Sequence, residues 1–318
     1  MLFRSYFSSS LFTTPTGMSG FIYTPAAIMC RYGLLSSAMV LTLQLLQKLR
    51  VMDNLAGEQK AMKAEHGLSF YVETGDMRIL FDFGAGRHAL ENALRLGIRP
   101  EQADIAVGSH GHYDHAAGYR DFVAAGLSCP LVTGNGFFEE KYARNGLKAT
   151  YLGTGFDSLF LEEHGIRHMV CDSVLPIGKD CWVMGGITRS HDFETVPERF
   201  VIRDKDGWKQ DYFQDEVCLV LEDKGELVVI VGCSHPGILN ILDTVSKRFS
   251  QPIRAVVGGT HLVEADRERI HMTLRTMKDL GIGLLGFNHC SGELLQSMMA
   301  EHPELNTVYL GAGDCLFL

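Results

Sequence analysis

The sequence has no excess of positive charge and no closely spaced cysteines. Its formal net charge is −9, which argues against non-specific nucleic-acid binding, because such binding needs a basic face. The eight cysteines are scattered, without a Cys-x-x-Cys pair, so we expect no disulfide framework and favour a reducing compartment such as the cytoplasm. We therefore expect no nucleic-acid partner.

Long hydrophobic runs are also absent. The apolar run over residues 33–46 is shorter than the roughly 20 residues that a membrane-spanning helix needs, so we expect no integral membrane segment. No acidic residue precedes Asp53, and this composition over residues 1–48 is typical of an organelle-targeting leader. A signal peptide and a true start at Met29 or Met39 are the alternatives for this N-terminal extension. Only a genuine targeting leader would make the protein organellar.

Residues 49–318 are expected to form one catalytic domain. Over the whole sequence, hydrophobic residues make up 46% and charged residues 21%, which is ordinary for a globular enzyme. Short apolar runs alternate with helical periodicity and predict an α/β protein, whereas residues 127–208 are turn-rich and predict few clear elements. The expected strands are 68–73, 77–83, 104–108, 130–133, 168–172, 181–184, 227–231, 255–258, 283–287 and 307–310, and the expected helices are 87–96, 116–125, 238–249, 266–280 and 293–301.

The most informative segment is Ser109-His110-Gly111-His112-Tyr113-Asp114-His115, which follows the apolar residues 104–108. Imidazole nitrogens and carboxylate oxygens are ligands of zinc, iron and manganese. His110 and His112 lie two residues apart on extended chain, so their side chains point the same way and can share one metal ion. Asp114 and His115 follow after a turn and face a neighbouring position. A short acid–base cluster is the alternative interpretation.

Three strand-to-helix junctions in the last third of the chain each place a histidine beside small residues. These histidines are His235, His261 and His289. Because the carboxyl ends of neighbouring parallel strands meet at one crevice, we expect the three side chains to converge on the His110 segment. A single histidine of this kind would be an ordinary core residue, but the repetition favours a shared site.

The histidine motif resembles that of the metallo-β-lactamase fold superfamily. The resemblance rests on His110-x-His112-x-Asp114-His115 after a strand, with an upstream strand that ends in Asp82. Three further segments resemble a narrower subgroup that includes the archaeal dihydropterin/ribofuranosylaminobenzene 5′-phosphate synthase. They are Glu65-His66-Gly67-Leu68-Ser69, the segment 232–238 and His289-Cys290-Ser291-Gly292.

The resemblance implies a four-layer αββα sandwich with two divalent metal ions at one edge of the sheets. Zinc is the first expectation for both ions, with iron or manganese as alternatives. The implied ligands are His110, His112 and His235 for the first metal and Asp114, His115 and His289 for the second.

Three further residues bear on this assignment of metal ligands. Asp82 is expected behind the ligands, where its carboxylate orients one of them. Many members have a bridging aspartate where this chain has Cys233, so either the thiolate acts as a ligand or the bridge is missing. The role of His261 stays open between metal ligand, substrate contact and proton donor.

Three residues are candidates for contact with the substrate. Arg189 suits a phosphate or carboxylate, because its guanidinium fork matches such groups; the alternative is a surface ion pair. His191 lies in the same loop and could equally be solvated. His66 is expected to approach the pocket from the N-terminal strands.

The ligand set favours a metal-dependent hydrolase of a small ester, lactone, thioester or phosphate-bearing metabolite. Metal ions would activate water and polarise the substrate, with Asp114 accepting a proton and His261 as a second catalytic group. A transferase resembling the synthase is the first alternative, since activation of a phosphate leaving group serves both reactions. A non-catalytic, metal-dependent ligand-binding protein is the second. The sequence indicates no oligomeric state.

Overall fold

The computed structural model describes residues 48–53, 57 and 60–318. The expected N-terminal extension, 1–48, lies outside the described residues except for Lys48, and its assignment stays a prediction. Among the described residues, the strands form two seven-stranded sheets and a smaller sheet of four strands.

The first large sheet joins the N-terminal strands to the last strand of the chain. Its order is β18-β1-β2-β3-β4-β5-β8, antiparallel from β18 to β3 and parallel from β3 to β8. Its strands are β1 (Lys48–Met52), β2 (Ser69–Glu73), β3 (Arg78–Phe81), β4 (Ile105–Val107), β5 (Leu131–Thr133), β8 (His168–Val170) and β18 (Cys315–Phe317).

The second large sheet contains the strands predicted for the last third of the chain. Its order is β17-β16-β15-β14-β13-β10-β9, parallel from β17 to β14 and antiparallel from there to β9. Its strands are β9 (Val174–Gly178), β10 (Cys181–Met184), β13 (Cys218–Asp223), β14 (Glu226–Val231), β15 (Ile253–Gly259), β16 (Leu284–Asn288) and β17 (Asn306–Tyr309).

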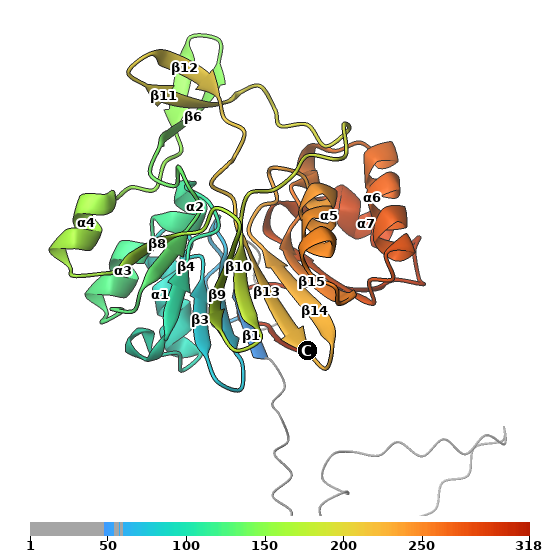
Figure 1. Ribbon diagram of the computed structural model, residues 1–318, viewed down its shortest axis with the longest axis horizontal. Helices are drawn as coiled ribbons and strands as arrows, with labels where there is room; N and C mark the ends of the chain where they lie inside the picture. The colour runs from blue at the N-terminus through green and yellow to red at the C-terminus, as the bar shows by residue number, and fades with distance from the viewer. Residues whose placement is uncertain (1–47, 54–56, 58–59) are drawn as a thin grey trace, which may run out of the picture. The chain divides into compact units, whose positions relative to one another are not determined.

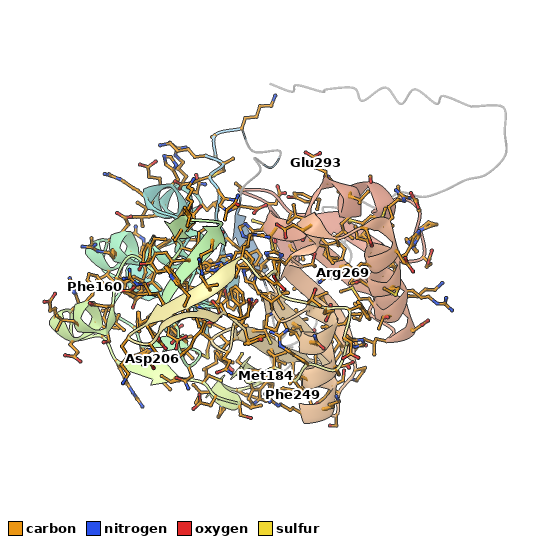
Figure 2. The ribbon with its side chains drawn as sticks, turned by 90° about the horizontal axis from the view of Figure 1, so that it is seen from above. Phe160, Met184, Asp206, Phe249, Arg269 and Glu293 are labelled. Carbon is orange, nitrogen blue, oxygen red and sulfur yellow. The ribbon has the colours of Figure 1, made fainter. Side chains whose placement is uncertain are left out.

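The helices cover the outer faces of the two sheets (Figure 1). On one side lie α1 (Arg87–Arg95), α3 (Tyr119–Ala124) and α4 (Ser158–Glu163), and on the other α5 (Ile238–Arg248), α6 (Arg267–Asp279) and α7 (Glu293–Met299). Viewed from above, Phe160 of α4 and Arg269 of α6 lie on opposite sides with the strands between them (Figure 2). The predicted αββα sandwich is therefore confirmed.

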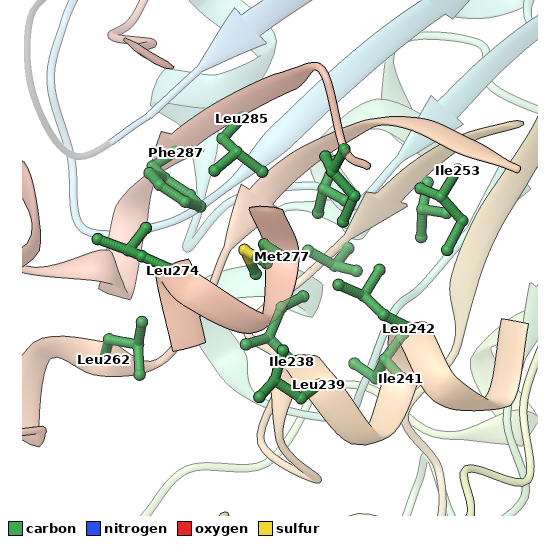
Figure 3. Packing of buried hydrophobic residues seen from close by; sticks show 14 of the residues in the cluster. Ile238, Leu239, Ile241, Leu242, Ile253, Leu262, Leu274, Met277, Leu285 and Phe287 are labelled. Atoms are coloured by element: carbon green, nitrogen blue, oxygen red, sulfur yellow. The ribbon is translucent and has the colours of Figure 1, made fainter. Parts of the chain in front are cut away.

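The side chains of β14 are buried on both faces of the second sheet, which explains why this sheet lies between the first sheet and a layer of helices. Val228 and Ile230 of β14 belong to the core between the sheets, whereas Val229 and Val231 belong to the core under α5 and α6. Successive side chains of a strand point to opposite faces, so a strand that is apolar at every position must be covered on both. In the second of these cores, Leu242 of α5 and Met277 of α6 pack together over the sheet (Figure 3).

A small sheet was not predicted from the turn-rich middle of the chain. Its strands are β6 (Glu140–Asn145), β7 (Lys148–Tyr151), β11 (Phe200–Asp204) and β12 (Gly207–Gln210), in the order β12-β11-β6-β7. It lies beyond one end of the two large sheets, at the top of Figure 1.

The helix predicted over 116–125 differs in the structure: α2 (Tyr113–Ala116) and α3 replace it. Asp114 and His115 therefore lie on the short helix α2, which follows the bend at residues 110–111.

None of the helices in the described part of the chain combines the length and the apolar character that crossing a bilayer requires.

Candidate metal centre

The predicted ligands lie where parallel strands of both sheets end. The histidine segment follows β4, His235 follows β14, and His289 opens the short 3-10 helix η4 (His289–Ser291) directly after β16. The helix α2, which begins at Tyr113, lies at the same ends of the strands (Figure 1). The topology thus brings together residues that are far apart in the sequence.

The first group consists of His110, His112 and His235. The ring centroids lie 4.8 Å apart for His110 and His112, and 4.9 Å from each of these to His235. All three side chains are buried, and one nitrogen of each lies within 4.8 Å of the other two. The arrangement brings three nitrogen donors to one point.

The first group has the free donor atoms that a metal ion needs. Within the described part of the chain, Nε2 of His110, Nε2 of His112 and both ring nitrogens of His235 have no hydrogen-bond partner. Buried polar atoms normally have one. Burial lowers the pKa of His112 to about 3 and the pKa values of His110 and His235 well below the usual range, so the imidazoles are neutral with lone pairs available. Zinc accepts such nitrogen donors.

The second group consists of Asp114, His115 and His289. Nε2 of His289 lies 3.3 Å from Oδ2 of Asp114 and 3.0 Å from Nε2 of His115. Nε2 of His115 lies 3.8 Å from the same carboxylate oxygen. Burial lowers the pKa of His289 to about 4. This group therefore offers nitrogen and oxygen donors beside the first.

Asp82 lies behind both groups, at the end of β3, and is fully buried. Its carboxylate accepts hydrogen bonds from the Ser109 backbone N–H at 2.7 Å and from the Ser109 hydroxyl at 2.8 Å, and lies 2.6 Å from Nδ1 of His115. Burial alone would lower the pKa of His115, but the carboxylates of Asp82 and Asp114 outweigh it and raise this pKa to about 9. Asp82 thus orients the His115 ring with Nε2 toward the second group.

Cys233 lies between the two groups. Its Sγ is 3.1 Å from Nε2 of His115, and it can share a ligand cluster with His110 and His115 or with His289 and Cys290. Burial raises the pKa of the Cys233 thiol well above its usual value. A sulfur atom therefore occupies the place where a bridging carboxylate was expected.

The remaining predicted residues lie at different distances from these groups. His261, at the end of β15, has its ring centroid 4.3 Å from that of His235. Nε2 of His66 lies 3.1 Å from Oδ2 of Asp114. His191 is directed to Asp243 instead, with Nε2 3.0 Å from Oδ2, and is not among the residues of either ligand group.

Two adjoining cavities lie near the first group, and none of its three histidines lines either of them. One of about 540 Å³ is lined by Phe213 and by Pro236, the residue after His235. The other, of about 600 Å³, is lined by His191. Arg189 and Tyr212 line both cavities. Two of the predicted substrate contacts therefore share one concave surface.

Comparison with known proteins identifies the family. The model of the metallo-β-lactamase superfamily matches residues 62–128, which include the His110–His115 motif. An uncharacterized protein of Methanocaldococcus jannaschii is 30% identical over 247 residues, which are 76% of this chain and 89% of that protein. This chain belongs to the metallo-β-lactamase superfamily.

Two other proteins that are similar to this superfamily member have descriptive names. The 7,8-dihydropterin-6-methyl-4-(β-D-ribofuranosyl)-aminobenzene-5′-phosphate synthase of Methanocaldococcus jannaschii is 28% identical over 276 residues, 83% of this chain and 94% of that enzyme. The crystal structure of Tm1679, a metal-dependent hydrolase of the β-lactamase superfamily, matches with a TM-score of 0.75 and 28% identity, covering 86% of this chain and 99% of that one. The resemblance inferred from the motifs is confirmed.

Several residues that the sequence did not indicate hold the ligand loops of this metallo-β-lactamase fold. Asp215 accepts a hydrogen bond at 2.7 Å from the N–H of Gly111, between His110 and His112. Its neighbour Glu216 accepts at 2.9 Å from the N–H of His235. The two adjacent carboxylates thus hold both loops of the first group.

The Asp215 carboxylate is itself tied to the small sheet. Nζ of Lys141, on β6, donates to Asp215 at 2.9 Å and to Asp211 at 2.8 Å, and all three side chains are buried. Phe213 lies between Asp211 and Asp215 in the sequence, and its ring stacks on that of His235 with centroids 3.9 Å apart. The only sequence signal was a pair of acids, 215–216, next to an apolar strand.

Asp53 approaches the second group from β1. Its Oδ2 accepts a hydrogen bond from the His289 N–H at 3.4 Å, and its Oδ1 lies 4.0 Å from Nδ1 of His289. Asp53 marked only the end of the acid-free N-terminal region in the sequence. Its position next to His289 depends on the pairing of β1 with β2.

Replacement of Asp82 by asparagine is expected to weaken binding of a second zinc equivalent by about 10- to 100-fold, because the carboxylate that orients His115 is lost. The measurement is a zinc titration of metal-stripped protein in competition with a chromophoric chelator. Asp76→Asn, in the exposed turn before β3, is the control and should bind zinc like the unmodified protein. Equal affinities in all three proteins would contradict this role for Asp82.

Proposed function

We propose that this protein is a metal-dependent hydrolase of a small ester, lactone, thioester or phosphate-bearing metabolite. The observation that supports this most is the trio of buried imidazoles with free nitrogens in the first group. In this proposal His110, His112 and His235 hold one divalent ion, and Asp114, His115 and His289 hold the other. Zinc is the first candidate for both, with iron or manganese as alternatives.

Bound divalent ions would lower the pKa of a water molecule toward neutrality and polarise the bond that is broken. The protein's own residues then handle protons and orientation. The carboxylate of Asp114 lies among the ligand nitrogens and is assigned the role of proton acceptor. Burial lowers the pKa of His261, so its neutral ring keeps an N–H that can hydrogen-bond to a leaving group.

The two cavities, of which the first reaches Phe213 and Pro236 next to His235, are the proposed substrate site. Arg189 donates a hydrogen bond to the Tyr212 carbonyl at 2.9 Å, and its guanidinium carbon lies 5.6 Å from the Tyr212 ring centroid. A guanidinium held in this way suits a phosphate or carboxylate of the substrate. His191, in the wall of the second cavity, is assigned a secondary contact.

Elemental analysis and chelation test this function directly. The purified protein should contain stoichiometric divalent metal, and removal of the metal with a chelator should abolish hydrolysis in a screen of phosphate esters, lactones and thioesters. Addition of zinc, iron or manganese should restore it. Protein without metal, or hydrolysis that survives complete chelation, would contradict the proposal.

A transferase is the second candidate, favoured by the 28% identity to the synthase over 94% of that enzyme's length. The same residues could promote the release of a phosphate leaving group while an electron-rich ring, instead of water, attacks the carbon from which it departs. Incubation with a pterin diphosphate and the ribofuranosylaminobenzene 5′-phosphate distinguishes the two. A joined product would favour the transferase, whereas hydrolysis alone would favour the hydrolase.

A further inference from the structure

Three imidazoles surround the Asp114 carboxylate, although the superfamily resemblance implied only two. Oδ2 of Asp114 lies 3.1 Å from Nε2 of His66, 3.3 Å from Nε2 of His289 and 3.8 Å from Nε2 of His115. His66 also lies against His289, with ring centroids 5.3 Å apart. The additional imidazole comes from the segment that precedes β2, far in sequence from the histidine motif.

The backbone holds His66 in this position. Two residues on, the Leu68 N–H donates to the Asp114 carbonyl at 3.1 Å, and the Leu68 carbonyl accepts from the Gly84 N–H at 2.9 Å. Between them, a Cβ on Gly67 would lie 2.7 Å from the Asp114 carbonyl oxygen, so only glycine allows this close approach. The segment is therefore fastened to the Asp114 turn itself, and the proximity of His66 follows from main-chain contacts.

The separations fit a four-ligand metal site. With zinc–nitrogen and zinc–oxygen distances of about 2.0–2.1 Å in a tetrahedron, neighbouring ligand atoms lie about 3.3 Å apart. In the structure the distances are 3.1 Å for His66 to Asp114, 3.3 Å for His289 to Asp114, 3.0 Å for His115 to His289 and, longer than this value, 3.8 Å for His115 to Asp114. His66, Asp114 and His289 also offer ligand atoms that all lie within 4.8 Å of one another.

We propose that His66 is a fourth protein ligand of the second metal, together with Asp114, His115 and His289. This inference rests on the proposed metal-dependent function and extends it. The first group has three protein ligands, which leaves a coordination position open for water or substrate, as in catalytic sites. The second group, once His66 is included, is closed by protein ligands.

His66 differs from the other ligands of the second group in its exposure. Its side chain is 59% exposed, compared with 0% for His115, 8% for Asp114 and 1% for His289. An exposed side chain can rotate away and return while its backbone stays fastened, whereas buried side chains cannot do so without local unfolding. His66 is therefore the ligand of the second group that can be displaced most readily.

A simpler role would be a hydrogen bond from His66 to the Asp114 carboxylate. Two substitutions separate these roles. His66→Ala removes both interactions, whereas His66→Gln keeps an N–H donor for the carboxylate but is a poor zinc ligand. His88→Ala is the matched control, because His88 is a partly exposed histidine beside the same segment, with Nδ1 3.3 Å from Oε2 of Glu65.

The experiment is a zinc titration of the metal-stripped full-length protein against a chromophoric chelator, repeated with Co²⁺ to follow the visible spectrum of each equivalent. In both His66 variants the dissociation constant of the second zinc should rise at least about tenfold, with the first unchanged, and the spectrum of the second cobalt should change. His88→Ala should behave like the unmodified protein.

Each other outcome overturns the inference. If His66→Gln binds two metals like the unmodified protein, His66 only donates a hydrogen bond. If His66→Ala also does so, His66 has no role at the site. A parent protein that takes up a single metal removes the second site but leaves the proposed hydrolase intact. A parent protein that binds no metal contradicts the proposed function itself.

Discussion

Replacement of His112 by alanine is expected to lower kcat/KM by on the order of 10²- to 10³-fold, the loss typical of removing one charge-stabilising group from an active site. His112 is buried and its Nε2 has no hydrogen-bond partner among the described residues, so its assigned role is to hold the first metal with His110 and His235. Two nitrogen donors hold zinc less firmly than three. The first zinc equivalent should therefore be lost together with turnover.

Steady-state kinetics and elemental analysis of the same samples check this prediction. His164→Ala is a suitable control, because His164 lies in an exposed position at the end of α4. This variant should retain the metal content and kcat/KM of the parent. Full activity in His112→Ala would contradict the assignment of the first group.

Replacement of Lys141 by methionine is expected to lower the free energy of unfolding by about 3–5 kcal/mol, the usual cost of removing one partner from a buried charge network. The Lys141 side chain is 1% exposed and lies between the carboxylates of Asp211 and Asp215. Methionine fills a similar volume but leaves these two acids buried without their cation. The Asp215 contact to the loop of His110 and His112 should weaken as well.

Urea denaturation followed by circular dichroism measures this difference. The control is Lys209→Met, since the Lys209 side chain on the small sheet is 57% exposed and pairs with Asp204. An exposed ion pair of this kind contributes at most about 1 kcal/mol. Equal unfolding midpoints for the two methionine variants would contradict a structural role for the buried lysine.

The strands of the last third of the chain could be predicted because they are apolar at nearly every position. Residues 227–231, 255–258 and 283–287 were expected and correspond to β14 (Glu226–Val231), β15 (Ile253–Gly259) and β16 (Leu284–Asn288). Strands covered on both faces form such continuous apolar runs. The boundaries differ by no more than two residues, because the flanking glycines and helix starts are clear.

The small sheet could not be predicted, because its strands lack this signal. All four residues of β7 are exposed, and β12 has only partly buried and exposed residues. Its strands also come from two segments, 140–151 and 200–210, which are separated by β8, β9 and β10. Neither alternation nor continuous burial marks these residues in the sequence, and their pairing is decided by contacts between distant segments.

The candidate ligands could be predicted locally, but their supporting residues could not. His110 to His115 form a dense motif, and density of donors is visible in the sequence. The sequence does not distinguish Asp215 and Glu216 from acidic residues on the surface. Their burial becomes apparent only in the folded structure, in which the adjacent strand β13 pairs with β10 and β14. Lys141 lies 74 positions from Asp215, so no local pattern connects them.

Asp215 and Glu216 accept hydrogen bonds from two loops that are far apart in the sequence. These contacts decide when the first group can form during synthesis of the chain. A chain emerges from the ribosome N-terminus first, so the loop of His110 and His112 is made long before the acids that hold it and before His235. No complete set of donors exists until β13 and β14 have joined the second sheet. On the proposed assignment, a metal ion that needs all three ligands of the first group would bind only after this stage, and it would then stabilise the finished protein.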